Sequence, residues 1–179
     1  MNNIVKLSSI RDSSKKELIV FQIKEIFYLS SSIKEFSSQE RKVAFFKRWC
    51  GDYIEYFSDQ FYIMTNGDKV LGYLSSCRNS HEAALRLEIP GFNEFLDHFR
   101  EFPAHFHINC HPDSRGLGIG GQLVEKLCDD LMLQHIEGVH LVTGPEALNV
   151  NFYRRLGFNI EIEKDFKQMK LLFMGRKLS

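Results

Sequence analysis

The stretch from residue 104 to residue 121, AHFHINCHPDSRGLGIGG, constrains the fold more than any other part of the chain. Its first seven residues predict an apolar strand over 104–110, and its glycine-rich end predicts a loop that opens a helix near Gly118. The first N–H groups of a helix have no acceptor within the helix, and the helix dipole places partial positive charge there. Arg115 adds a cation with a forked set of donors. This arrangement is typical of a site for a phosphate-bearing ligand.

Other interpretations of the same glycines are less consistent with the sequence. Gly116, Gly118 and Gly121 satisfy G-x-G-x-x-G, the dinucleotide fingerprint, which needs its first glycine almost directly after the strand and an acid after the next strand. Here residues 111–115 intervene, and the strand expected over 139–143 ends without an acid. A phosphate-binding P-loop is excluded because no Gly-Lys-Ser/Thr follows. A tight turn that binds nothing remains an alternative.

Two motifs in sequence order resemble those of the GNAT N-acetyltransferase superfamily. The run Arg115-Gly-Leu-Gly-Ile-Gly120 matches R/Q-x-x-G-x-G/A, the acetyl-CoA pyrophosphate loop of that superfamily. The run Asn149-Val-Asn-Phe-Tyr-Arg-Arg-Leu-Gly-Phe158 is similar to its second motif, a helix that carries a tyrosine and ends in Gly-Phe. The resemblance covers about residues 104–160. Within the superfamily, the runs PAHFHIN and GVHL resemble the branch related to the acetyltransferase-like domain of O-GlcNAc-removing glycosidases.

The resemblance implies an α/β, single-domain GNAT-type fold over residues 1–179, in which helices flank a mixed twisted β-sheet of about seven strands with splayed central parallel strands. Periodicity predicts strands over 3–10, 60–65, 70–78, 104–110, 139–142, 159–163 and 170–176, and helices over 38–56, 92–100, 118–133 and 146–156. A further helix is expected to follow a cap at Asp12 or Ser13 and to be broken by the serines at 30–32, and Ser38 is expected to start the helix over 38–56. Asn66-Gly67 predicts a hairpin with a type I′ turn. Residues 79–102 are expected to be a family-specific insertion, which either shapes acceptor specificity or decorates the surface.

The resemblance also implies the cofactor, acetyl-CoA, with CoA as product. The residues expected to bind it are Ile108, Asn109 and Cys110, through backbone pairing with the pantetheine arm, then Arg115, Gly116, Leu117, Gly118, Ile119, Gly120 and Gly121 around the diphosphate, and Asn149 and Phe152. Many family members carry an asparagine seven residues before the tyrosine, where this chain has Glu146. Asn149, four residues before Tyr153 and on the same helix face, is the substitute candidate.

Acetyl transfer to an amine requires a proton acceptor and a proton donor. Tyr153 is the expected general acid, because a phenol of pKa about 10 remains protonated at neutral pH and is able to serve a thiolate of pKa about 8.5. His107 is the expected base, with Glu88 and a water-mediated route as alternatives, because Asn109 stands where the glycosidase-related branch commonly has an aspartate. His105, His107 and His140 are alternatively hydrogen-bonded core residues or, together, ligands of a metal; we expect no metal.

Composition limits the partners. Lysine and arginine balance aspartate and glutamate, 23 against 23, so no net field directs the chain toward nucleic acid or an anionic membrane. No apolar stretch reaches the length of a membrane helix, and the N-terminal residues lack an export signal, so we expect a cytoplasmic protein. The four widely spaced cysteines predict reduced, buried thiols.

The expected function is therefore acetyl-CoA-dependent N-acetylation of a primary amine, carried by a small molecule or a peptide, by direct attack in a ternary complex. A non-catalytic acyl-CoA-binding or pseudo-acetyltransferase module is the alternative, and an interaction protein that uses the aromatic-rich first half is a third possibility. The sequence does not distinguish a monomer from a homodimer.

Overall fold

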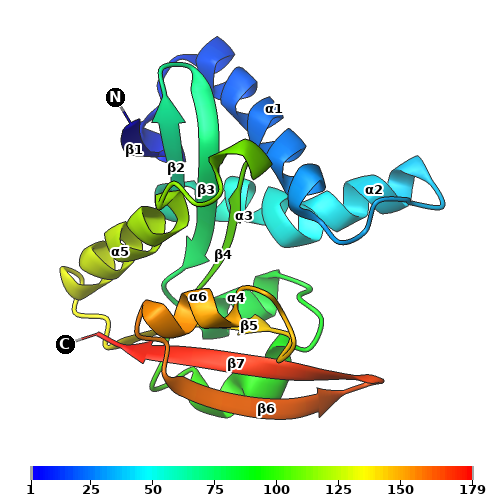
Figure 1. Cartoon of the computed structure of the whole chain (residues 1–179), viewed down its shortest axis with the longest axis vertical. Helices are drawn as coiled ribbons and strands as arrows, with labels where there is room; N and C mark the ends of the chain where they lie inside the picture. The colour runs from blue at the N-terminus through cyan, green and yellow to red at the C-terminus, as the bar shows by residue number, and fades with distance from the viewer. Residues whose placement is uncertain (1, 179) are drawn as a thin grey trace. The chain divides into compact units, whose positions relative to one another are not determined.

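The structure is a computed structural model that describes residues 2–178, and its helices and strands are labelled in Figure 1. The chain divides into two compact units, which are described separately. The first unit contains residues 2–76 and 107–127, and the second contains residues 77–106 and 128–178. Strand β4 (Ala104–Cys110) and helix α5 (Ile119–Met132) each contribute residues to both units.

The seven strands form one mixed sheet in the order β1-β2-β3-β4-β5-β7-β6. Parallel pairing between β4 and β5 (Gly138–Thr143) covers only Ala104↔Val139 and His105↔His140, although β4 continues to Cys110 and β5 to Thr143. The predicted α/β fold with about seven strands and splayed central parallel strands is therefore confirmed.

In the first unit, β1 (Asn2–Lys6) pairs with β2 (Phe61–Asn66), which forms an antiparallel hairpin with β3 (Lys69–Cys77). The strand predicted over 3–10 ends earlier, because the Ser9 hydroxyl donates to the carbonyl of Lys6, 2.6 Å away, in a 3₁₀ turn over Leu7–Ser9. The hairpin prediction is confirmed, but its turn type is wrong. Only Gly67 of the two turn residues has a positive φ, 60°, which is the pattern of a type II′ turn.

Helix α1 (Ser13–Ser30) begins where the Asp12 side chain accepts a 2.8 Å hydrogen bond from the backbone N–H of Lys15, as its capping residue predicts. It buries Ile19, Ile23, Ile26 and Phe27. Gln22 fixes α1 to the β2–β3 hairpin, because its amide donates to the carbonyl of Asp68 and accepts from the N–H of Val70, both at 2.8 Å. Figure 1 shows α1 beside that hairpin.

The helix predicted over 38–56 is helical but not uniform. It consists of α2 (Gln39–Phe46), a π-helical turn over Lys47–Gly51, and α3 (Asp52–Tyr56). Ser38 caps its start by accepting a 3.3 Å hydrogen bond from the N–H of Arg41. The π turn was not visible in the sequence, and it presents Trp49 and Cys50.

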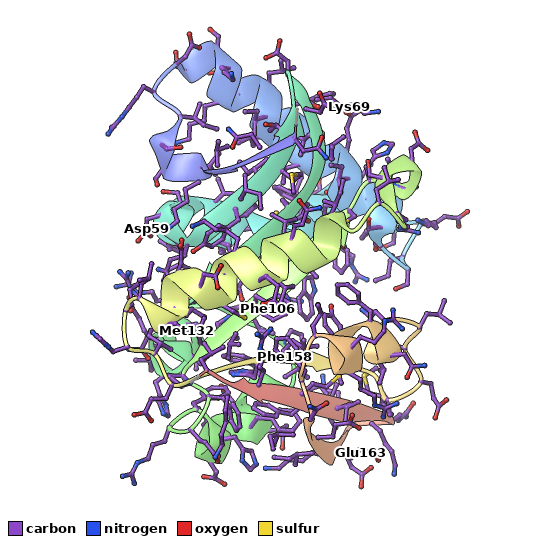
Figure 2. All side chains as sticks on the ribbon, turned by 60° about the vertical axis from the view of Figure 1, so that its left-hand side comes forward. Asp59, Lys69, Phe106, Met132, Phe158 and Glu163 are labelled. Atoms are coloured by element: carbon purple, nitrogen blue, oxygen red, sulfur yellow. The ribbon has the colours of Figure 1, made fainter. Side chains whose placement is uncertain are left out.

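In the second unit, β5 and β6 (Ile160–Phe166) both pair antiparallel with β7 (Met169–Lys177). Helix α6 (Val150–Arg155) begins later than predicted because successive turns from Gly144 to Val150 precede it. Figure 2 shows Phe106 and Phe158 next to one another, and their ring centroids are 5.6 Å apart.

The segment expected to be an insertion, 79–102, contributes to the core of the second unit. Helix α4 (Ser80–Arg86), which was not predicted, precedes a 3₁₀ helix over Phe92–His98, where an α-helix was predicted over 92–100. The segment's buried aromatic residues, none more than 4 % exposed, are Phe92, Phe95, Phe99 and Phe102. Surface decoration is therefore the wrong description of this segment.

Two findings concern the whole described range. None of the helices within residues 2–178 has both the length and the apolar character to cross a membrane. No disulfide joins any of the four cysteines; Cys50, Cys77 and Cys128 are buried as predicted, whereas Cys110 is half-buried.

Candidate active site

The glycine-rich loop belongs to the first unit and leads directly into α5. Gly116 and Gly118 have φ values of 78° and 73°, in the left-handed region that favours glycine. A Cβ atom at Gly116 would meet nothing within 4 Å, and one at Gly118 only the tip of Gln122 at 3.8 Å. Backbone conformation, and not lack of room, therefore requires these two glycines. The N–H groups of Ile119 and its neighbours lie in the first turn of α5, where the helix provides no acceptor.

The end of β4 is bound tightly to β3 and α1. A Cβ at Gly72 would lie 3.1 Å from both the carbonyl oxygen of Asn109 and Sγ of Cys110. The Ser30 hydroxyl donates to the Cys110 carbonyl over 3.3 Å, and the N–H of His111 donates to the carbonyl of Leu71 over 2.9 Å. Burial raises the pKa of the Cys110 thiol, and the charge of Arg115 lowers it by a smaller amount. The backbone that precedes the loop is therefore rigidly held.

His107 lies on the same strand, between two aromatic side chains. The rings of Trp49 and Tyr53 are each 5.5 Å from the imidazole and nearly perpendicular to it, at 89° and 80°. Burial lowers the pKa of His107 to about 4. The imidazole is therefore neutral at physiological pH.

Asn109 is held by a buried tyrosine of β3. Its Nδ2 donates to the hydroxyl of Tyr73 over 2.9 Å, and that hydroxyl is also hydrogen-bonded to the thiol of Cys50. Tyr73 is fully buried, and its ring stacks on Phe61 at 5.4 Å. Burial raises the pKa of Tyr73, and raises that of Cys50 to about 12, so both groups are protonated at neutral pH.

The second motif lies in the second unit, and a Schellman motif ends its helix. Gly157, with φ 82°, donates to the carbonyl of Arg154 at 3.0 Å, and Phe158 donates to the carbonyl of Tyr153 at 3.1 Å. Tyr153 is 5 % exposed, and its ring contacts Phe106 and Phe158 at 6.1 Å each. The Gly-Phe ending therefore anchors the helix that carries the tyrosine.

Comparison with known proteins decides the family. Residues 58–160, more than half of the chain, match the family model described as an acetyltransferase (GNAT) domain. The chain belongs to the GNAT acetyltransferase family. A search of curated protein sequences returns no match.

Solved structures share the GNAT fold at low sequence identity. The crystal structure of SsHAT matches with a TM-score of 0.72 at 16% identity, covering 99% of this chain and 98% of that one. The ribosomal-protein-S18-alanine N-acetyltransferase of Escherichia coli matches with a TM-score of 0.57 at 17% identity, over 100% and 95% of the two chains. The structure of yncA from Salmonella typhimurium with its cofactor acetyl-CoA matches with a TM-score of 0.56 at 16% identity, over 100% of this chain and 95% of that one.

The loop of this GNAT protein is suited to a diphosphate. Arg115 is exposed, the space where Gly116 would carry a Cβ is open, and the following helix presents its N-terminus. Leu117, 64% exposed, is the one apolar side chain among Arg115, Gly116, Leu117 and Gly118. These features fit the pyrophosphate of CoA, while side-chain bulk at the two glycines would not.

The predicted site residues fall into two groups. Residues His107 to Gly121 belong to the first unit, while Asn149, Phe152 and Tyr153 belong to the second. Within the first group, the structure brings His107 and Asn109 together with side chains that were not among the predicted site residues, namely Trp49, Cys50, Tyr53 and Tyr73. The helical spacing of Trp49 and Tyr53 was a usable signal, whereas nothing in the sequence singled out Tyr73.

His105 and His140 are hydrogen-bonded in the core of the second unit. The Ser80 hydroxyl donates to the Pro103 carbonyl at 2.8 Å, so Nδ1–H of His105 is the donor in its 2.9 Å bond to Ser80. His140 Nδ1–H donates to the Phe102 carbonyl at 2.8 Å. Glu88 is exposed beyond α4. Within residues 2–178, no three histidine, cysteine, aspartate or glutamate side chains are grouped to hold a metal ion.

Proposed function

We propose that this GNAT protein is an acetyl-CoA-dependent N-acetyltransferase that acetylates a primary amine, on a small molecule or a peptide, by direct attack in a ternary complex. The observation that carries the proposal is the loop from Arg115 to Gly121, whose two left-handed glycines and open backbone precede the N-terminus of α5. Two relatives support it: one was solved with acetyl-CoA, and another is named for N-acetylation of an alanine.

The cofactor would be held by backbone and by one cation. The N–H groups from Gly116 to Gly121 and the guanidinium of Arg115 bind the diphosphate, and the backbone of Ile108, Asn109 and Cys110 pairs with the pantetheine arm. Asn149 and Phe152 add contacts from α6. Acetyl-CoA supplies a thioester, so that an N–C bond forms while the C–S bond breaks.

His107 takes the proton that the amine nitrogen loses. Its imidazole remains neutral above about pH 4, because burial between Trp49 and Tyr53 disfavours the charged form. Such a weak base does not deprotonate an alkylammonium ion of pKa about 10. The amine therefore enters uncharged, and His107 accepts the far more acidic proton that remains on nitrogen after attack.

Tyr153 gives its phenolic proton to the departing thiolate. It remains protonated at neutral pH because a phenol has a pKa of about 10, slightly above the value of about 8.5 for a thiol. Its hydroxyl is 3.4 Å from Nδ2 of Asn149, which orients it.

Thermal melting with and without acetyl-CoA tests cofactor binding. Saturation at a hundredfold excess over Kd stabilises a protein by about 2.7 kcal/mol, so the melting temperature rises by several degrees. The double variant Arg115→Glu, Gly118→Glu should melt at a temperature that acetyl-CoA leaves unchanged. No shift in the wild-type protein would refute cofactor binding. A shift without amine-dependent release of CoA would instead identify a non-catalytic acyl-CoA-binding module.

A further inference from the structure

We infer that Asn109 binds the N–H of the acceptor amine through Oδ1, and that Tyr73 is the positioning residue that points this oxygen toward the acceptor. The inference rests on the proposed N-acetyltransferase function and adds to it a residue that selects the acceptor. The side-chain carboxamide of Asn109, near the end of β4, is half-buried. Its Nδ2 is hydrogen-bonded to the hydroxyl of Tyr73.

The hydrogen bond to Tyr73 determines the orientation of the Asn109 carboxamide. The Tyr73 hydroxyl is hydrogen-bonded to the thiol of Cys50 and to the side chain of Asn109. In the bond to Asn109 the phenolic oxygen is the acceptor and the N–H of Nδ2 is the donor, over 2.9 Å. The stacking of Tyr73 on Phe61 and its complete burial hold the hydroxyl in place.

This orientation leaves Oδ1 as the available atom of Asn109. Among the residues that the structure describes, none donates a hydrogen bond to Oδ1. His107 lies two residues earlier on the strand, on the same face, where it accepts the amine's proton in the proposed mechanism. An amine nitrogen bound here would donate one N–H to Oδ1 while its lone pair attacks the thioester.

The arrangement also limits the acceptor. A carboxamide oxygen accepts a hydrogen bond without carrying charge, and the neighbouring side chains are aromatic or neutral: Trp49, Tyr53 and His107. Such surroundings favour an uncharged amine over an ammonium ion, because none of these side chains supplies a negative charge to offset the cost of removing a charge from water. The expected acceptor is therefore a primary amine whose pKa lies below that of a lysine side chain, clearly so for an α-amino group and slightly so for an arylalkylamine.

A double-mutant cycle between Tyr73 and Asn109 tests the inference. The amine probe is the better of phenethylamine and an alanine-initiated tetrapeptide, and release of CoA is followed at varied amine concentration. Tyr73→Phe should raise the KM for the amine about tenfold, the equivalent of one hydrogen bond, because the carboxamide is then free to turn Nδ2 toward the acceptor. The affinity for acetyl-CoA should be unchanged, and Tyr62→Phe, which alters another buried tyrosine of the same unit, should leave the KM unchanged.

The Asn109→Asp background supplies the discriminating result. Both carboxylate oxygens accept hydrogen bonds, so turning the group changes nothing, and Tyr73→Phe should cost less than twofold in KM there. It should also cost less than twofold in the Asn109→Ala background, which covers the case in which Asn109→Asp fails to fold. An equal cost of Tyr73→Phe in all backgrounds would mean that Tyr73 is merely structural, and would overturn the inference alone. A wild-type protein that releases no CoA with either amine would overturn the proposed function as well.

Discussion

The side-chain amide of Asn149 lies 3.4 Å from the hydroxyl of Tyr153, one helical turn further along the chain. This hydrogen bond is long, so Asn149 orients the phenol only weakly, and in the proposed mechanism it is the phenol that gives up a proton. Tyr153→Phe should lower kcat by about 10²- to 10³-fold, because it removes the proton donor for the thiolate. Asn149→Ala should lower kcat by less than tenfold. Steady-state release of CoA measures both.

Binding of acetyl-CoA is the control for Tyr153→Phe. The ring of Tyr153 packs against Phe106 and Phe158, and Tyr153→Phe keeps that ring. The melting temperature and the affinity for acetyl-CoA should therefore change little. Unaltered kcat in Tyr153→Phe would assign the proton donor to another group.

Replacing a loop glycine should affect both stability and cofactor binding. Gly116→Ala and Gly118→Ala each place a side chain at a positive φ, which costs about 1–2 kcal/mol for a non-glycine residue. The backbone relieves this strain by moving, so the affinity for acetyl-CoA should fall about tenfold or more, as measured by calorimetry. Gly67→Ala is the matched control, since Gly67 has φ +60° and an equally open Cβ position but lies in the β2–β3 turn. It should lose similar stability and bind acetyl-CoA normally.

The pH dependence of stability should report on His107. Its pKa in the folded protein is about 4, below the ordinary 6.5, so between these values the unfolded chain holds a proton that the folded chain lacks. Stability conferred by the neutral imidazole is complete above pH 6.5 and is lost as the pH falls toward 4, by up to about 1.4 kcal/mol per pH unit. His107→Gln should flatten the urea-denaturation profile between pH 6.5 and 4. The exposed His81→Gln should leave it as steep as in the wild type.

Alkylation should be selective for one cysteine. Cys110 is half-buried, whereas Cys50, Cys77 and Cys128 are buried, so iodoacetamide should modify Cys110 first in the native protein. Because burial raises the pKa of this thiol, the reaction should be slow at pH 7 and accelerate as the pH rises. Peptide mass mapping identifies the site. Acetyl-CoA should protect Cys110, and modification that acetyl-CoA does not slow would contradict cofactor pairing with the end of β4.

Features with a local cause could be predicted from the sequence. The caps at Asp12 and Ser38, the hairpin at Gly67 and the end of α6 at Gly157 each follow from a residue whose own chemistry determines the backbone around it. The seven strands followed from periodicity and family resemblance together. The glycine-rich loop was identified for the same reason, because Gly116 and Gly118 are residues that readily adopt a positive φ.

Features that depend on distant packing could not be predicted. The family resemblance predicts an insertion over 79–102, because a compact acetyltransferase connects the flanking strands more directly, yet the second unit buries all four phenylalanines of this segment. The contacts of His107 with Trp49, and of Asn109 with Tyr73, join residues 58 and 36 positions apart, respectively, and no local pattern encodes them. The sequence likewise does not distinguish His107 from His105 and His140, because the difference between them lies in the distant residues that pack against each imidazole.

Because of the π-helical turn over Lys47–Gly51, the surroundings of His107 depend on the number of residues between α2 and α3 as well as on their identity. Each residue of an α-helix advances the side-chain direction by about 100°, so the one extra residue in a π turn sets the angular phase between α2 and α3. Deleting a single residue there would restore ordinary helix and rotate Trp49 away from His107 without altering any side chain that contacts the imidazole. Homologous chains that differ by one residue at this turn would thus surround the same histidine with differently placed aromatic rings.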